Sequence, residues 1–178
     1  MANIFNKDET IHVFKWENLG NIKEGRTDLG EEMPVLVYRL MQFTMLDVLT
    51  KDFGPDKANE YFRRAGYLAG SEFVKNNLDT SVDFSVFVSK LQELLIDYKI
   101  GILRIEEFDD VTNNIVLTVA QDLDCSGLPI TNETVCNYDE GFLAGILDVY
   151  TGAKYKVEEI ECWATGDRVC RFNATVTG

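Results

Sequence analysis

Histidine is nearly absent from this chain of 178 residues, which contains a single one, His12. A Ser-His-Asp hydrolase needs a histidine base beside its nucleophile, and His12 lies in an N-terminal stretch that we expect to form an arm. As a surface residue His12 needs no functional explanation, and its context does not favour haem ligation. The sequence also has no G-x-G-x-x-G signature and no iron–sulfur cysteine spacing. We therefore expect a protein that is not an enzyme.

Positive charge is scarce: 17 Lys and Arg residues stand against 30 Asp and Glu residues, for a net charge of −13. Such a surface repels phosphate backbones and anionic lipid headgroups, so neither nucleic acid nor a membrane is an expected partner. Long apolar runs are missing too, and the first residues, MANIFNKDET, have no basic start. We expect a cytoplasmic protein, whose thiols stay reduced and serve as free thiols or metal ligands rather than disulfides.

The remaining composition, with 46% apolar residues, suits one domain with a sizeable core. We expect residues 33–178 to form this domain. Residues 1–32 are mixed and polar, and they are predicted to form an N-terminal arm that lies on the domain or on a second subunit. The alternative is a frayed leader. A short apolar stretch over residues 11–16 predicts one strand in this arm.

Helical spacing of apolar residues predicts three helices in the first half of the domain. The first begins near Pro34 and ends before Gly54, and it is apolar on so many sides that we expect it to be buried on more than one. The second covers residues 55–77 and carries a stripe of small residues that predicts close packing against its backbone. The third covers residues 81–99, with Ser81 as a candidate cap.

Alternating apolar residues then predict strands over 99–108 and 113–123, a helix over 137–151, and a hairpin over 155–176. Runs of helices followed by hairpins are typical of the α+β class. We expect N-terminal helices packed on an antiparallel sheet, with one helix between two C-terminal hairpins.

All four cysteines lie in the last third of the chain, each where a predicted element starts or stops. Four thiols that meet at one corner would suit tetrahedral zinc. Buried free thiols and, in an oxidising compartment, two disulfides are the alternatives, because the sequence has no C-x-x-C pair to decide between them. The four are Cys125, Cys136, Cys162 and Cys170.

The stretch DLDCSGLP…VCNYDEGFLAGILDVYTG…EIECWATGDRVCRF closely resembles the 4-vinyl reductase domain family. The likeness covers roughly residues 100–176. The family includes sensor domains of phenol- and xylene-responsive transcription activators, a protein tied to bacteriochlorophyll vinyl reduction, and stand-alone proteins called hydrocarbon-binding. Its fold is similar to that of TRAPP vesicle-tethering subunits.

The resemblance implies a structural zinc ion. In the aromatic sensors three cysteines and a glutamate hold the metal, and Cys136, Cys162 and Cys170 have the spacing of those cysteines. The glutamate has no clear match, and Cys125 is its natural replacement, with Glu133 or Asp124 as alternatives.

The resemblance also implies an apolar chamber for a small hydrophobic ligand. Two glycines inside the predicted helix 137–151 indicate a close approach, either to a neighbouring element or to a ligand. The phenol sensors hold the ligand hydroxyl with a histidine and a tryptophan, and the lone histidine here lies in the arm, which argues against that clamp. Candidate ligand residues are Tyr38, Phe43, Phe62, Phe73, Gly141, Gly145 and Trp163.

These features together favour a ligand-binding sensor module that has a structural zinc and acts through a partner protein. We expect a homodimer joined through the first helices and the arm. The alternatives are an accessory protein of a tetrapyrrole vinyl reductase and a dimeric scaffold without ligand.

Overall fold

The computed structural model describes residues 14–177, which divide into two compact units between Glu31 and Glu32. The first unit contains a 3-10 helix, η1 (Trp16–Leu19), and one helical turn, α1 (Ile22–Gly25). The strand predicted over residues 11–16 lies mostly outside the described residues, as does His12. Its described end, at Trp16, starts a 3-10 helix instead.

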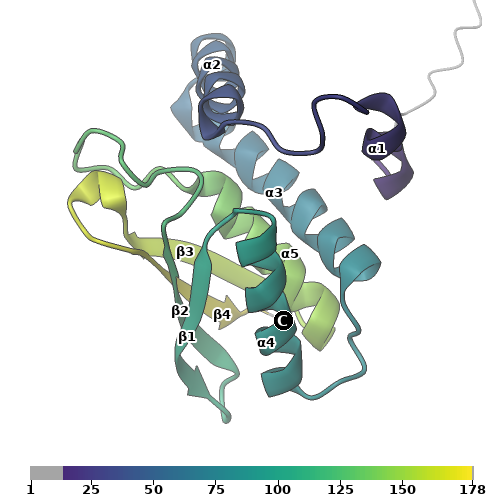
Figure 1. Cartoon of the computed structure of the whole chain (residues 1–178). Coiled ribbons are helices and arrows are strands. Elements are labelled where there is room, and N and C mark those ends of the chain that lie inside the picture. The colour runs from purple at the N-terminus through teal and green to yellow at the C-terminus, as the bar shows by residue number, and fades with distance from the viewer. Residues whose placement is uncertain (1–13, 178) are drawn as a thin grey trace, which may run out of the picture. The chain divides into compact units, whose positions relative to one another are not determined.

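The second unit has the predicted α+β architecture, with helices first and a helix between two hairpins (Figure 1). Among residues 14–177, no helix is both long and apolar enough to cross a membrane. In chain order the elements are α2 (Val35–Phe53), α3 (Pro55–Asn77), α4 (Phe84–Asp97), β1 (Ile102–Asp109), β2 (Asn114–Ala120), α5 (Asn137–Thr151), β3 (Tyr155–Glu161), η2 (Trp163–Thr165) and β4 (Cys170–Val176).

The four strands form one antiparallel sheet in the order β1-β2-β4-β3. Alternate residues of each strand point to one buried face, so Leu117 of β2 lies opposite Phe172 of β4, and both are almost fully buried. Helices α4 and α5 pack on the sheet, and Phe87 of α4 stacks on Tyr150 of α5 with ring centroids 4.1 Å apart. The core therefore lies between the sheet and these two helices.

Helix α5 is the centre of the unit, with residues 139–148 all buried. It packs along α3 at very short range, because glycines face the partner backbone from both helices. A side chain at Gly66 or Gly70 of α3 would overlap α5 backbone carbonyls, and one at Gly141 or Gly145 would overlap those of α3. The close approach predicted from these glycines is thus to a neighbouring helix.

Two local expectations were wrong. Helix α4 begins after Asp83 rather than Ser81, because the Ser81 amide and hydroxyl both bond the Asp79 carboxylate in the preceding turn. Helix α2 is not buried on several sides: Leu36 is 68% exposed, and Gln42 is its buried residue. Apolar periodicity reports that a face avoids water, but it does not say whether the same chain covers that face.

The glycine contact between α3 and α5 gives a stability prediction. Replacing Gly141 with alanine places a methyl group on the Arg63 carbonyl oxygen, so the helices must separate, and we expect the free energy of unfolding to fall by about 2–3 kcal/mol. Gly25→Ala is the control, since its added carbon meets nothing within 4 Å. Urea denaturation measures both variants, and equal stability of the two would contradict this packing.

Candidate metal centre and ligand pocket

Four cysteine sulfurs converge at one end of the sheet. Cys125 follows β2, Cys136 caps α5, Cys162 follows β3, and Cys170 starts β4. All four thiols are free and buried, and their sulfurs lie within 4.8 Å of one another. The structure thus brings together the four residues that the sequence singled out.

The spacing of the sulfurs fits a tetrahedral metal ion. The Cys136 sulfur lies 3.8 Å from that of Cys162 and 3.8 Å from that of Cys170. Tetrahedral zinc with bonds of about 2.3 Å to sulfur separates its ligands by about 3.8 Å. The Cys125 and Cys170 sulfurs are closer, at 3.0 Å, but well beyond the length of about 2.05 Å that a disulfide requires.

The thiols share their protons unequally. Hydrogen bonds from Cys125, Cys136 and Cys170 lower the pKa of Cys162, whereas hydrogen bonds within the same cluster raise the pKa values of Cys136 and Cys170. One thiolate at Cys162, solvated by three neutral thiols, is the favoured form without metal. A metal ion would displace the remaining protons, because thiolates are the binding form of cysteine.

Backbone contacts hold the cysteines in place. The Cys125 amide donates to Asp122 Oδ1 at 3.2 Å, and the Cys136 amide donates to Glu159 Oε2 at 3.0 Å. The turn after Cys162 is closed by the Thr165 hydroxyl, which accepts from the Cys162 amide at 3.0 Å. These hydrogen bonds support three of the four ligand positions, as is usual for metal ligands in proteins.

Buried carboxyl groups surround the cysteines. Desolvation raises the pKa of Glu159 to about 8 and also raises the pKa values of Asp122 and Asp139. Neutral carboxyl groups, together with the positive end of the α5 dipole at Cys136, limit the negative charge around a thiolate cluster. A second group that brings metal-ligating atoms together, Asp122, Cys136 and Asp139, shares Cys136 with the cluster.

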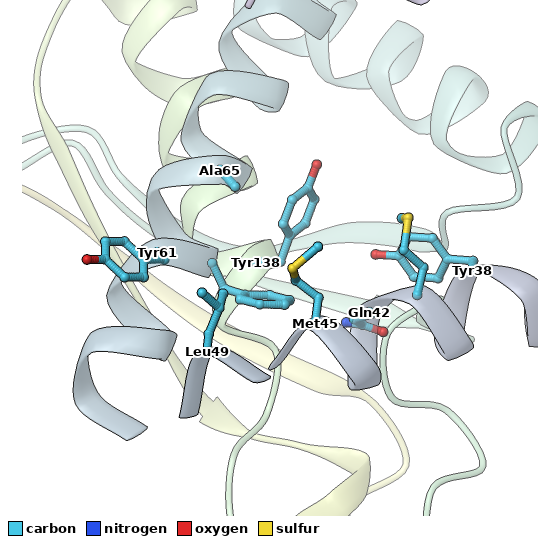
Figure 2. Close-up of a pocket in the computed structure, with 9 residues that line it drawn as sticks. Tyr38, Gln42, Met45, Leu49, Tyr61, Ala65 and Tyr138 are labelled. Carbon is cyan, nitrogen blue, oxygen red and sulfur yellow. The ribbon is translucent and has the colours of Figure 1, made fainter. Parts of the chain in front are cut away.

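An apolar pocket of about 350 Å³ lies between α2, α3 and the start of α5 (Figure 2). Its walls are thioether, aliphatic and aromatic groups, and Gln42 supplies an amide. The lining residues are Tyr38, Met41, Gln42, Met45, Leu49, Tyr61, Phe62, Ala65 and Tyr138.

Three hydrogen bonds join the pocket helix α2 to the loop that carries Cys125. The Tyr38 hydroxyl donates to Asp124 Oδ1 at 2.7 Å. Arg39 donates through Nε to the Leu123 carbonyl and through Nη2 to the Ser126 carbonyl, each at 2.9 Å. The pocket wall and the cysteine cluster are therefore parts of one connected structure.

Burial shapes the electrostatics of this junction. Desolvation, followed by the charge of Asp122, raises the pKa of Asp124 to about 7, against the hydrogen bonds from Tyr38 and Gln42. Desolvation also raises the pKa of Tyr138 to about 12. The pocket is therefore neutral and apolar apart from the end nearest Asp124.

Of the predicted ligand residues, Tyr38 and Phe62 line this pocket. Phe43 is half-buried on α2 outside the lining, and Phe73 lies in the core against Tyr98 and Phe142. The remaining three also lie outside it: Gly141 and Gly145 face the backbone of α3, and Trp163 donates its indole N–H to the Leu128 carbonyl at 3.0 Å.

Sequence reasoning missed most of the lining. Gln42 carried a signal, since it is an amide within the otherwise apolar run LMQFTML. Tyr138, two residues after Cys136, carried another, since its place at the start of α5 brings it beside α3. Met41, Met45 and Leu49 gave no signal that separates a pocket wall from a core face.

Comparison with known proteins places this architecture. The model of the vinyl-4-reductase domain, the family named above as 4-vinyl reductase, matches residues 115–176, which include Cys125 and the other three cysteines. Protein MJ1642 of Methanocaldococcus jannaschii is 31% identical over 145 residues, which cover 82% of this chain and 79% of the relative. The chain belongs to the vinyl-4-reductase domain family.

Solved structures share the vinyl-4-reductase fold at low sequence identity. A vinyl-4-reductase family protein from Methanocaldococcus jannaschii has a TM-score of 0.62 at 15% identity, covering 94% of this chain and 99% of that one. The phenol-responsive sensory domain of the transcription activator PoxR, solved with phenol, has a TM-score of 0.61 at 15% identity, covering 88% and 90%. A trafficking protein particle complex subunit 3 from Naegleria fowleri, covalently bound to palmitic acid, has a TM-score of 0.64 at 11% identity, covering 81% and 95%.

Proposed function

We propose that this vinyl-4-reductase family protein is a sensor module that binds a small hydrophobic molecule in the pocket between α2 and α3 and signals through a partner protein. The observation that carries the proposal is the pocket itself: about 350 Å³, mainly apolar walls, and a few polar groups at one end. Such a composition is typical of small-molecule sites. Two proteins of the same fold were solved with apolar or aromatic ligands, phenol and palmitic acid, which supports the proposal. The protein acts as a binding module rather than as an enzyme.

The cysteine cluster, in this proposal, holds a structural zinc ion. Cys125, Cys136, Cys162 and Cys170 supply four thiolates, which leaves no coordination position for a substrate. The metal joins the Cys125 loop, the start of α5 and the β3–β4 connection, so its binding free energy contributes to folding. Free thiols suit a reducing compartment such as the cytoplasm.

The proposal includes a homodimer formed through α2. This helix exposes a large apolar surface, and such patches mark interaction sites. A second copy is the occupant that matches this face, because a twofold axis pairs an apolar helix with itself and leaves the acidic surfaces outside. Met41 and Met45 belong both to this surface and to the pocket, so a second copy would cover the pocket. The exposed apolar residues of α2 are Val35, Leu36, Val37, Leu40, Met41, Met45, Val48 and Phe53.

Zinc removal tests the metal site. We expect about one zinc per chain in the wild-type protein, and we expect Cys162→Ser to lose most of it and to unfold at a lower denaturant concentration. Elemental analysis and urea denaturation give the two readouts. Val119→Ala is the control, because it truncates a buried neighbour of Cys170 and should cost about 2 kcal/mol while keeping the zinc. Full stability of Cys162→Ser would mean that the thiols are ordinary core residues.

Filling the pocket tests the ligand site. We expect ethylbenzene to bind the wild-type protein, and we expect Ala65→Phe to weaken this binding at least about tenfold, because the new ring occupies the cavity. Titration calorimetry measures the affinity, and Leu68→Phe is the control, since Leu68 is 50% exposed on the same helix and outside the lining. Equal binding by Ala65→Phe and the wild-type protein would place the ligand elsewhere.

Light scattering tests the dimer. We expect a dimer at tens of micromolar and a monomer for Leu40→Glu, because a buried unpaired charge at the interface opposes association. Val111→Glu places the same charge on an exposed turn residue and should remain dimeric. A monomeric wild-type protein would rule out this interface.

A further inference from the structure

One end of the pocket is polar in an unbalanced way. Gln42 is 8% exposed, lines the pocket, and has a side-chain oxygen, Oε1, with no hydrogen-bond partner among the described residues. Its amide group faces the Asp124 carboxylate, which accepts a hydrogen bond from it. A buried amide oxygen without a partner is unfavourable, so the site has an acceptor that lacks its donor.

The neighbouring groups cannot supply that donor. The Tyr38 hydroxyl donates to Asp124 Oδ1, and the Arg39 guanidinium donates to two loop carbonyls. Asp124 itself is 3% exposed, and its second oxygen, Oδ2, also has no partner among the described residues. The hydrogen-bonding capacity left at this end is therefore acceptor capacity.

The rest of the pocket defines the other half of a ligand. Met41, Met45, Leu49 and Phe62 present apolar surface beside Gln42 (Figure 2). A molecule that fills this space buries a hydrophobic body against these side chains and has one end at the amide oxygen. An acceptor-only end, such as a carboxylate, would face Gln42 Oε1 without a hydrogen bond and close to the Asp124 carboxyl group.

We infer that the pocket selects apolar molecules that carry a hydrogen-bond donor, a hydroxyl or an amine, and that Gln42 Oε1 is the group that receives this donor. This inference rests on the proposed function of the pocket as a ligand site and adds the chemical class of the ligand. Gln42 is thereby the specificity-determining residue, while the thioether and aromatic walls supply affinity.

Titration calorimetry with four probes of similar size tests the inference: ethylbenzene, 4-ethylphenol, 2-phenylethylamine and 3-phenylpropionate. We expect 4-ethylphenol or 2-phenylethylamine to bind the wild-type protein at least about tenfold more tightly than ethylbenzene, and 3-phenylpropionate to bind least well. The better of the two donors tells whether the natural group is a hydroxyl or an ammonium. Gln42→Met keeps the shape of the side chain and removes the acceptor, so the donor preference should fall about tenfold while ethylbenzene affinity stays within about threefold.

The melting temperature of Gln42→Met gives an independent readout. Removing a buried acceptor that lacks a partner should leave the melting temperature equal to or above that of the wild-type protein. Equal affinity for ethylbenzene and both donors, tighter binding of 3-phenylpropionate, or an unchanged preference in Gln42→Met would overturn the inference and leave the apolar pocket as a site. Failure of all four probes to bind would overturn the proposed function as well.

Discussion

The structure depends on the convergence of four cysteine sulfurs at one end of the sheet. Cys125 lies in the loop after β2, Cys136 caps α5, and Cys162 and Cys170 flank the β3–β4 connection, so segments up to 45 residues apart in the chain meet there. Backbone amides bonded to Asp122, Glu159 and Thr165 position these ligands before any metal binds. A bound ion would then stabilise an arrangement that already exists, at little cost in conformational entropy.

The second dependence runs from this corner to α2. Tyr38 and Arg39, adjacent in sequence, bind the loop between Asp122 and Ser126, next to Cys125. The same helix supplies one wall of the pocket and an exposed apolar surface. A ligand that shifts α2 would thus act on the surface proposed for the second copy, while the cysteine corner holds the other end of these hydrogen bonds fixed. Two sites coupled through one rigid element of this kind are a physical basis for sensing.

Periodicity in the sequence was sufficient for most of the fold. The bounds of α3 and α5 follow from their apolar spacing and from Pro55 and Gly152 at their ends, because proline at a first turn and a left-handed glycine after the last turn are local constraints. The start of α4 did not follow, since Ser81 and Asp83 are both plausible caps and the Asp79 turn chooses between them. The exposure of α2 did not follow either, because apolar residues look the same whether a core or a partner covers them.

Sequence alone determined the elements, their order, the family and the four cysteines that meet, because each depends on local chemistry or on a motif with fixed spacing. Only the tertiary structure decided which side chains form the pocket. Tyr38, Phe62 and Tyr138 come from three helices, and their meeting depends on how closely α3 approaches α5 and how α2 crosses α3. It also separated Phe73, a core residue, from Phe62, a pocket residue. No single-chain pattern contains such distances, because packing geometry depends on the shapes of all the contacting side chains together.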